Sequence, residues 1–138
     1  MDLLTEATPQ SARWLRVRFT EWLRTTGVSV TLIDDLTIAV YEALANVVEH
    51  AYPSGHPDPV MRLRAQFDHS QVLITISDHG CWRPPSAPGS RGRGLNIMRY
   101  LATEVQLHTT DHGTTVHLRV DLHYSGNGCA PKEPASAP

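Results

Sequence analysis

The sequence has few of the features that would assign a protein to a special class. Its 138 residues include only two cysteines, Cys81 and Cys129, far apart in the chain, so we expect neither a disulfide framework nor a thiolate metal site. No apolar run approaches the length of a membrane span. The net charge of -2 gives no broad electrostatic reason to bind nucleic acid or a membrane surface. The composition therefore predicts an ordinary globular protein.

Length and the first residues narrow this expectation. A chain of 138 residues is long enough to bury a single core, so we expect one globular domain over residues 9–122. Residues 1–8 form a short N-terminal segment, and residues 123–138 form a tail rich in Gly, Pro, Ser and Ala that we expect to be disordered. The start of the chain lacks the basic and apolar regions of a signal peptide, which favours a cytoplasmic location.

The stretch from Leu36 to Tyr52 is the predicted centre of the fold. Its apolar residues gather on one side of an α-helix, and Glu42, Asn46 and His50 follow one another at one-turn intervals on the polar side. A carboxylate and an amide oxygen one turn apart are able to hold a hydrated magnesium ion. A polar helix face that meets only water explains the same pattern, so both interpretations stand at this point.

Local signals mark the other elements. Thr8 and Pro9 begin a first helix that Gly27 ends. Period-two alternation predicts strands over 60–67 and 72–76, and later over 104–108 and 113–122, as two antiparallel hairpins. A loop over 79–93 and a short helix from Gly94 separate the hairpins. The order predicts an α+β fold: a two-layer α/β sandwich with helices on one face of a mixed, mostly antiparallel sheet.

Two further motifs suggest recognition of a nucleotide. Asp78 leaves a strand two residues before Gly80, and such a carboxylate is able to accept a hydrogen bond from an exocyclic amine such as that of adenine. The segment 91–94, Arg-Gly-Arg-Gly, opens a helix with the amides and positive charge that suit phosphate. Asp-x-Gly is also a common turn sequence, and the second motif also fits a solvated loop.

A third motif, Gly113-Thr114-Thr115, would supply strand hydroxyls to an adenine pocket, although a turn followed by a Thr-rich strand explains it better. Together the motifs resemble the N, G1, G2 and G3 boxes of the GHKL ATPase superfamily. The residues that carry this resemblance are Glu42-x-x-x-Asn46-x-x-x-His50, Asp78-x-Gly80, Gly92-x-Gly94 and Gly113-Thr114-Thr115. Within the superfamily, residues 9–122 resemble the small anti-sigma-factor serine kinases of bacteria.

The resemblance implies a Bergerat-type site for ATP and Mg2+. By this likeness Asn46 would bind the magnesium ion, and Glu42 would be the catalytic base. Asp78 would accept a hydrogen bond from the adenine amine, with Thr115 supporting that end of the pocket. The other residues implied to contact the nucleotide are His50, Gly80, Arg91, Gly92, Arg93, Gly94, Leu95 and Thr114.

Partners follow from the same resemblance. It implies an anti-sigma factor that sequesters a sigma factor, phosphorylates a serine of an anti-anti-sigma factor and forms a homodimer, with Arg13 as a partner contact. The alternative is a nucleotide-binding anti-sigma or protein-binding module without kinase activity. Family members usually begin with a sheet strand before the first helix. Only Met1 to Ala7 precede Thr8 here, so we expect that strand to be stunted or missing.

Overall fold

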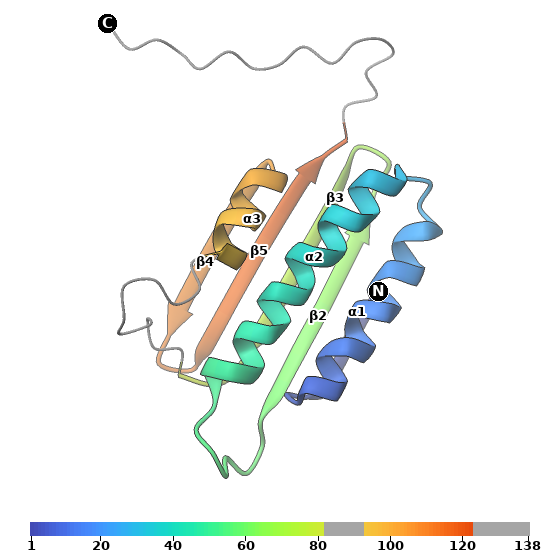
Figure 1. Cartoon of the computed structure of the whole chain (residues 1–138). Helices are drawn as coiled ribbons and strands as arrows, with labels where there is room; N and C mark the ends of the chain where they lie inside the picture. Colours follow the sequence, from blue (N-terminus) through green and yellow to red (C-terminus); the bar gives the residue numbers. More distant parts are fainter. Residues whose placement is uncertain (82–92, 123–138) are drawn as a thin grey trace, which may run out of the picture.

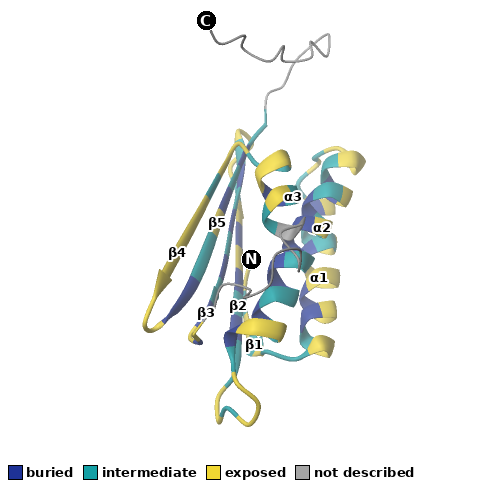
Figure 2. Ribbon diagram, turned by 60° about the vertical axis from the view of Figure 1, so that its left-hand side comes forward, coloured by how far each residue is buried: buried dark blue, intermediate teal, exposed yellow. Residues whose placement is uncertain are grey.

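A computed structural model describes residues 1–81 and 93–122 of the chain (Figure 1). The elements in order are β1 (Asp2–Glu6), α1 (Pro9–Arg24), α2 (Val30–Asn46), the π-helix η1 (Val47–Ala51), β2 (Val60–Phe67), β3 (Gln71–Asp78), α3 (Arg93–Leu101), β4 (Glu104–Thr110) and β5 (Gly113–Asp121). Within these ranges the strands form one antiparallel sheet in the order β1-β2-β3-β5-β4. All the described helices cover the same face of the sheet (Figure 2). The predicted α+β two-layer sandwich is confirmed, with every strand pair antiparallel.

The core lies between the sheet and the helices, where Figure 2 shows the buried residues. Alternate residues of β2 and β3 point into it, as the period-two pattern predicts. On the helix side, α1 and α2 contribute leucine, valine, alanine and phenylalanine at helical spacing. The most deeply buried large side chains are Phe19, Leu15, Leu23, Leu36, Leu44, Met61, Leu63, Ile74, Ile76, Met98, Leu118 and Val40.

The start and end of α1 agree with the local signals. Thr8 is the N-cap, and its Oγ1 accepts a hydrogen bond from the amide of Ser11 over 3.1 Å. Pro9 occupies the first turn, where it needs no intrahelical donor. Beyond the last helical residue, Gly27 has a φ of +78°, which an L side chain rarely adopts.

The central helix differs from the expectation at both ends. It begins at Val30, where Ser29 caps the amide of Leu32 over 3.2 Å, earlier than the stretch chosen from the sequence. Its last turn, η1, is a π-helix, which is wider than an α-helical turn. The carbonyl oxygen of Ala51 accepts a bond of 2.8 Å from the amide of Cys81, a contact between distant segments that no helical pattern could have predicted.

The expectation of a stunted or missing first strand is wrong. β1 pairs with β2 along its whole length, from Asp2 opposite Arg64 to Glu6 opposite Val60. The Asp2 carboxylate also accepts two bonds from Arg62, of 2.7 and 2.6 Å. The segment is too short for a clear alternation, so it takes its strand conformation from the open edge of β2.

The expected disordered tail (123–138) and most of the expected loop, over 82–92, lie outside the described residues. In the described part of the chain, no helix is both long and apolar enough to cross a membrane.

Candidate nucleotide-binding site

Three segments meet at one end of the sheet: the end of η1, the end of β3 and the start of β5. Gly80 marks the closest approach, because a Cβ atom at this position would lie 2.0 Å from the carbonyl oxygen of Ala51. The amide of Cys81 bonds to that same oxygen. Only glycine lets β3 leave the sheet against the end of η1 in this way.

Asp78 is the buried acid at this end of the sheet, with 6% of its surface exposed. Its Oδ1 accepts hydrogen bonds from the amides of Gly80, at 2.9 Å, and Thr114, at 3.3 Å. Burial raises the pKa of the carboxyl group, and the two amide bonds oppose that rise. No described residue donates to Oδ2. One carboxylate oxygen is therefore held by the protein, and the other remains as an acceptor.

The start of β5 completes this corner. Gly113 has a φ of +140°, and a Cβ atom there would lie 2.0 Å from the carbonyl oxygen of Asp78. Thr114 is also buried, and its Oγ1 has no hydrogen-bond partner among the described residues. A buried hydroxyl without a partner is costly unless a ligand or ordered water satisfies it.

Thr115 does not support Asp78 as the sequence predicts. It pairs with Ser77, and side chains alternate along a strand, so its side chain lies on the opposite face of the sheet from Asp78. Thr114 takes the place expected for Thr115. The G3-like motif identified the correct turn, but the face that each threonine presents depends on the register of β5 against β3.

Glu42 and Asn46 are both partly buried on α2. The side of α2 that faces α1 is identified by a bond of 3.0 Å between the hydroxyls of Thr20 and Thr37. Asn46 follows Thr37 by about two and a half turns, which puts it on the opposite side of α2. Glu42 lies one turn earlier on the same side, so both side chains face away from α1, on the side where α3 lies (Figure 1). The carboxamide of Asn46 makes no capping bond to the start of η1.

The other predicted residues are more scattered. His50 lies in η1, exposed, with Nε2 3.6 Å from Oε2 of Glu49. The α-helical spacing assumed for His50 does not hold there, since η1 is a π-helix. Arg93 and Gly94 are the first residues of α3, and Leu95 packs against the core. Arg91 and Gly92 fall outside the described residues.

Arg13 is exposed on α1, on a helix whose buried face packs on the sheet and α2. The sequence motifs assign no role to Tyr52, the last residue of the stretch that begins at Leu36. Its hydroxyl bonds to the backbone of two other segments, at Val60 and His79. The only sequence feature that could have indicated this role is the position of Tyr52 between a helix and a proline-rich turn.

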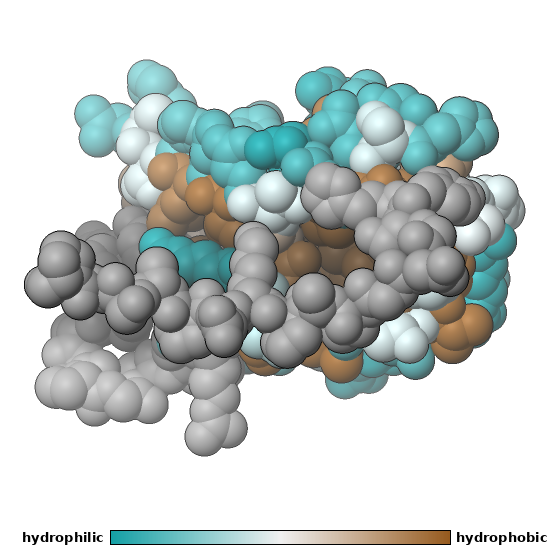
Figure 3. All heavy atoms as spheres, turned by 90° about the horizontal axis from the view of Figure 1, so that it is seen from above, coloured by the Kyte–Doolittle hydropathy of each residue, from teal (hydrophilic) through white to brown (hydrophobic). Residues whose placement is uncertain are grey.

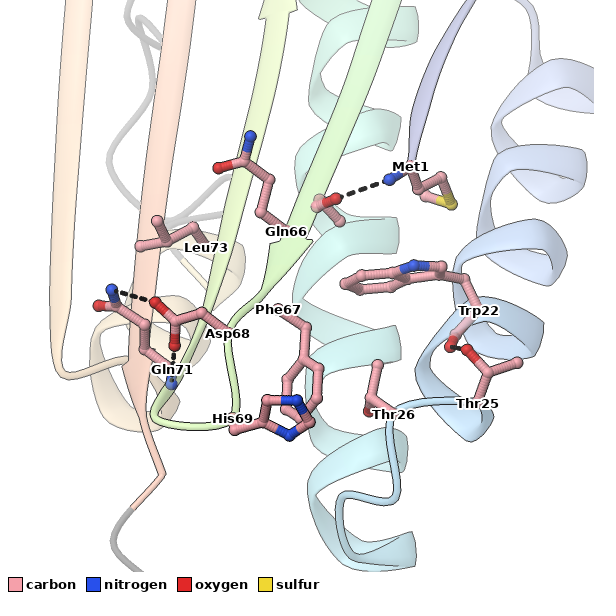
Figure 4. A pocket seen from close by; sticks show the side chains of 11 residues that line it. Met1, Trp22, Thr25, Thr26, Gln66, Phe67, Asp68, His69, Gln71 and Leu73 are labelled. Atoms are coloured by element: carbon pink, nitrogen blue, oxygen red, sulfur yellow. Dashed lines mark hydrogen bonds between the residues drawn. The ribbon is translucent and has the colours of Figure 1, made fainter.

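A cleft of about 690 Å3 opens at the other end of β3, near Trp22, Phe67 and His69 (Figure 4). Figure 3 looks toward that end, where apolar atoms show between hydrophilic ones. Asp68 in this cleft is committed to its own turn. Its carboxylate accepts bonds from Ser70 and Gln71, which lower its pKa to about 2. Both carboxylate oxygens of Asp68 are therefore engaged by its own turn, whereas one oxygen of Asp78 has no donor among the described residues.

Known proteins identify the family of this chain. The family model of the histidine kinase-like ATPase domain matches residues 5–120. An anti-sigma F factor of Pasteuria penetrans is 31% identical over 108 residues, which cover 69% of this chain and 72% of that protein.

Solved structures of other proteins have a similar fold. The crystal structure of the RsbU and RsbW domains of a Mycobacterium tuberculosis protein has a TM-score of 0.64 and 25% identity over 87% of this chain. This chain spans 32% of that one. The histidine kinase domain of a blue-light activated histidine kinase of Erythrobacter litoralis has a TM-score of 0.54 and 22% identity, over 67% of this chain and 46% of that one, and shows the fold alone. The chain therefore belongs to the GHKL superfamily, in the anti-sigma-factor kinase family with its histidine kinase-like ATPase domain.

Proposed function

We propose that this protein is a cytoplasmic anti-sigma factor that binds ATP and Mg2+ and phosphorylates a serine of an anti-anti-sigma factor. The observation that carries the proposal is the state of Asp78. Its Oδ1 is held by two backbone amides while Oδ2 is left without a donor from the described chain. The match to the histidine kinase-like ATPase domain supports the binding of a nucleotide. The free oxygen of Asp78 supports adenine as the base of that nucleotide.

The fit to adenine rests on complementary donors and acceptors. An unused carboxylate oxygen accepts the exocyclic amine of adenine, and a hydrogen bond to a charged group contributes about 1.5–3 kcal/mol. The unpartnered hydroxyl of Thr114 offers a second polar contact beside it. A guanine or hypoxanthine base has a carbonyl where adenine has the amine, and that carbonyl would face the same carboxylate oxygen unfavourably.

The phosphate end of the site is assigned to α2 and the start of α3. Asn46 would contribute an amide oxygen to Mg2+, a ligand type that this cation accepts. Magnesium, when bound, would neutralise the charge of the phosphates. The remaining phosphate contacts would come from backbone and side chains near the N-terminus of α3, where amides and a partial positive charge favour anions. They are Arg91, Gly92, Arg93 and Gly94, with Leu95 and His50 bordering the nucleotide.

Glu42 is proposed as the general base. Its carboxylate would take the proton from the serine hydroxyl as the serine oxygen bonds to the γ-phosphorus and the bond to the β-γ bridging oxygen breaks. ADP leaves with the electron pair of that bond. Glu42 lies one turn from Asn46 on the same side of α2, so the base and the proposed metal ligand come from one rigid element.

Partner binding is assigned to α1. Arg13 is exposed there and makes no hydrogen bond or ion pair to another described residue, so its guanidinium is available to an acidic surface. We propose that the sigma factor and the anti-anti-sigma factor use this helix, and that the protein acts as a homodimer.

A single-turnover reaction with γ-labelled ATP and a candidate anti-anti-sigma factor tests the kinase. Transfer of the label to serine supports it. Measurable ATP binding without any transfer would instead favour the second candidate, a nucleotide-binding anti-sigma module that has no kinase activity. A thermal shift with ATP and Mg2+ against Mg2+ alone tests nucleotide binding in either case.

A further inference from the structure

We propose that Tyr52 is a positioning residue for nucleobase recognition. Its hydroxyl holds the backbone at His79 and so keeps the neighbouring Asp78 carboxylate in place. The inference rests on the proposed nucleotide function. It gives a task to a side chain that would not itself touch the nucleotide.

The hydroxyl of Tyr52 joins three segments of the chain. It donates to the carbonyl oxygen of Val60, at 2.5 Å, and accepts from the amide of His79, at 2.8 Å. Val60 is the first residue of β2, and His79 directly follows the last residue of β3. One phenol therefore connects the end of the central helix to both strands of the first hairpin.

This contact lies where the sheet stops supporting the chain. Asp78 is the last residue of β3 that pairs with β2, opposite Met61. The amide of His79 has no ladder partner and bonds to Tyr52 instead. Two positions later, the amide of Cys81 bonds to Ala51. Segment 79–81 is thus attached to residues 51 and 52 by one bond on each side of Gly80.

The phenol has the form that this task requires. Its ordinary pKa of 10.0 already leaves the hydroxyl protonated at neutral pH, and desolvation raises that pKa further, so the hydroxyl is able to donate to Val60 while accepting from His79. The ring also lies against His56, with centroids 4.8 Å apart, which limits its rotation.

Loss of the Tyr52 hydroxyl should affect one part of nucleotide binding and not the other. Tyr52 holds the residue next to Asp78, whereas the proposed phosphate contacts lie on α2 and α3. Loss of the hydroxyl should therefore weaken recognition of the base and leave the binding of the triphosphate group nearly unchanged. A general loss of stability would affect every nucleotide alike.

The test compares the full-length wild type, Tyr52→Phe and Tyr41→Phe by calorimetric titration with ATP and with inosine triphosphate, which has a carbonyl in place of the adenine amine. Tyr41 is the control, because it lies on α2, the helix that leads into η1 and Tyr52, its ring contacts Arg16, and its hydroxyl makes no hydrogen bond to a described residue. In Tyr52→Phe we expect the affinity for ATP to fall roughly tenfold, the size of one lost polar contact, with inosine triphosphate nearly unaffected.

Amide hydrogen exchange provides a second measurement that needs no nucleotide. In Tyr52→Phe the amide of His79 should exchange at least several-fold faster, while the amides of the β3 ladder, such as Ile76, keep their rates. Equal acceleration of both would indicate a merely structural role and overturn the proposal. An unchanged ratio of ATP to inosine triphosphate affinity would also overturn it. If the wild type and Tyr41→Phe bind no ATP, the proposed function itself fails and this inference falls with it.

Discussion

The amide of Thr114 donates to Oδ1 of Asp78 over 3.3 Å, although the two residues lie 36 positions apart in the chain. This bond joins the start of β5 to the end of β3. Together with the amide of Gly80 it occupies one oxygen of the carboxylate and sets the direction of the other. The proposed selectivity for adenine depends on that division between the two oxygens.

Asp78→Asn should reverse the preference for the base. The amide oxygen of the new side chain would replace Oδ1 as acceptor for the two backbone amides, which places an NH2 donor where Oδ2 was. Affinity for ATP should fall by roughly tenfold to a hundredfold, the range for a lost charge-assisted bond. Affinity for inosine triphosphate should rise or stay the same. Titration calorimetry measures both, and an unchanged ATP affinity would remove Asp78 from adenine recognition.

The same substitution should have a pH-dependent effect on stability. The pKa of Asp78 is raised above its ordinary value of 3.8, so the folded protein binds this proton more tightly than the unfolded chain does. In the wild type, the protonated carboxyl group of Asp78 therefore stabilises the fold below pH 3.8. This stabilisation is lost as the pH rises through the raised pKa. Relative to wild type, Asp78→Asn should therefore be more stable at about pH 7 than at about pH 3. Urea unfolding at both pH values measures this, and the opposite order would contradict burial as the cause.

Asn46→Ala should abolish magnesium-dependent ATP binding and leave the fold intact. The side chain is only partly buried and makes no capping bond, so the free energy of unfolding should change by no more than about 0.5 kcal/mol. Calorimetry with ATP and Mg2+ and a urea titration measure the two effects. Asp34→Ala, at an exposed position of the same helix, is the control that should keep ATP binding. Full affinity in Asn46→Ala would favour a polar face that meets only water.

Glu42→Gln should retain ATP and lose phosphoryl transfer. The amide keeps the size and polarity of the side chain, but it cannot accept the serine proton. Transfer should drop by about 10²-fold or more, the usual contribution of a general base. Single-turnover transfer, measured beside ATP affinity, separates chemistry from binding. A variant that transfers at the wild-type rate would show that Glu42 is not the base.

Gly80→Ala should destabilise the protein far more than Gly55→Ala. A Cβ atom at position 80 would meet the backbone oxygen of Ala51 at 2.0 Å, and backbone cannot move aside as a flexible side chain can. We expect a loss of about 3 kcal/mol or more. Gly55 has a φ of +79° and open space around it, so alanine there should cost only the backbone strain, about 1–2 kcal/mol. Equal midpoints in urea would contradict the close approach at Gly80.

Arg13→Ala should weaken binding of the protein partners and leave ATP affinity unchanged. The matched control is Arg18→Ala on the same helix. Arg18 is already paired with Glu21 at 2.9 Å and points roughly 140° away from Arg13 around the helix. Pull-down or calorimetric binding of a cognate sigma factor measures the effect, and we expect a loss of roughly tenfold for Arg13→Ala alone. Equal losses in both variants would indicate a general charge effect.

Neighbouring residues carried enough information to predict most of the elements. The cap at Thr8, the alternation over 60–67 and the breakers after Tyr52 act within a few positions of one another, so each could be read directly from the chain. The motifs around Glu42, Asp78 and Gly113 identified the family for the same reason, since each is a short run with its own spacing.

Contacts between distant segments decided the rest. β1 forms because the edge of β2 is open to it, the last turn of the central helix becomes η1 where Cys81 meets Ala51, and Thr114 rather than Thr115 faces Asp78 because of the register of β5 on β3. Local patterns specify the conformation of a segment, but they do not specify the partner it meets or the side chain it presents there. That pairing depends on how the layers pack, which is a property of the folded chain.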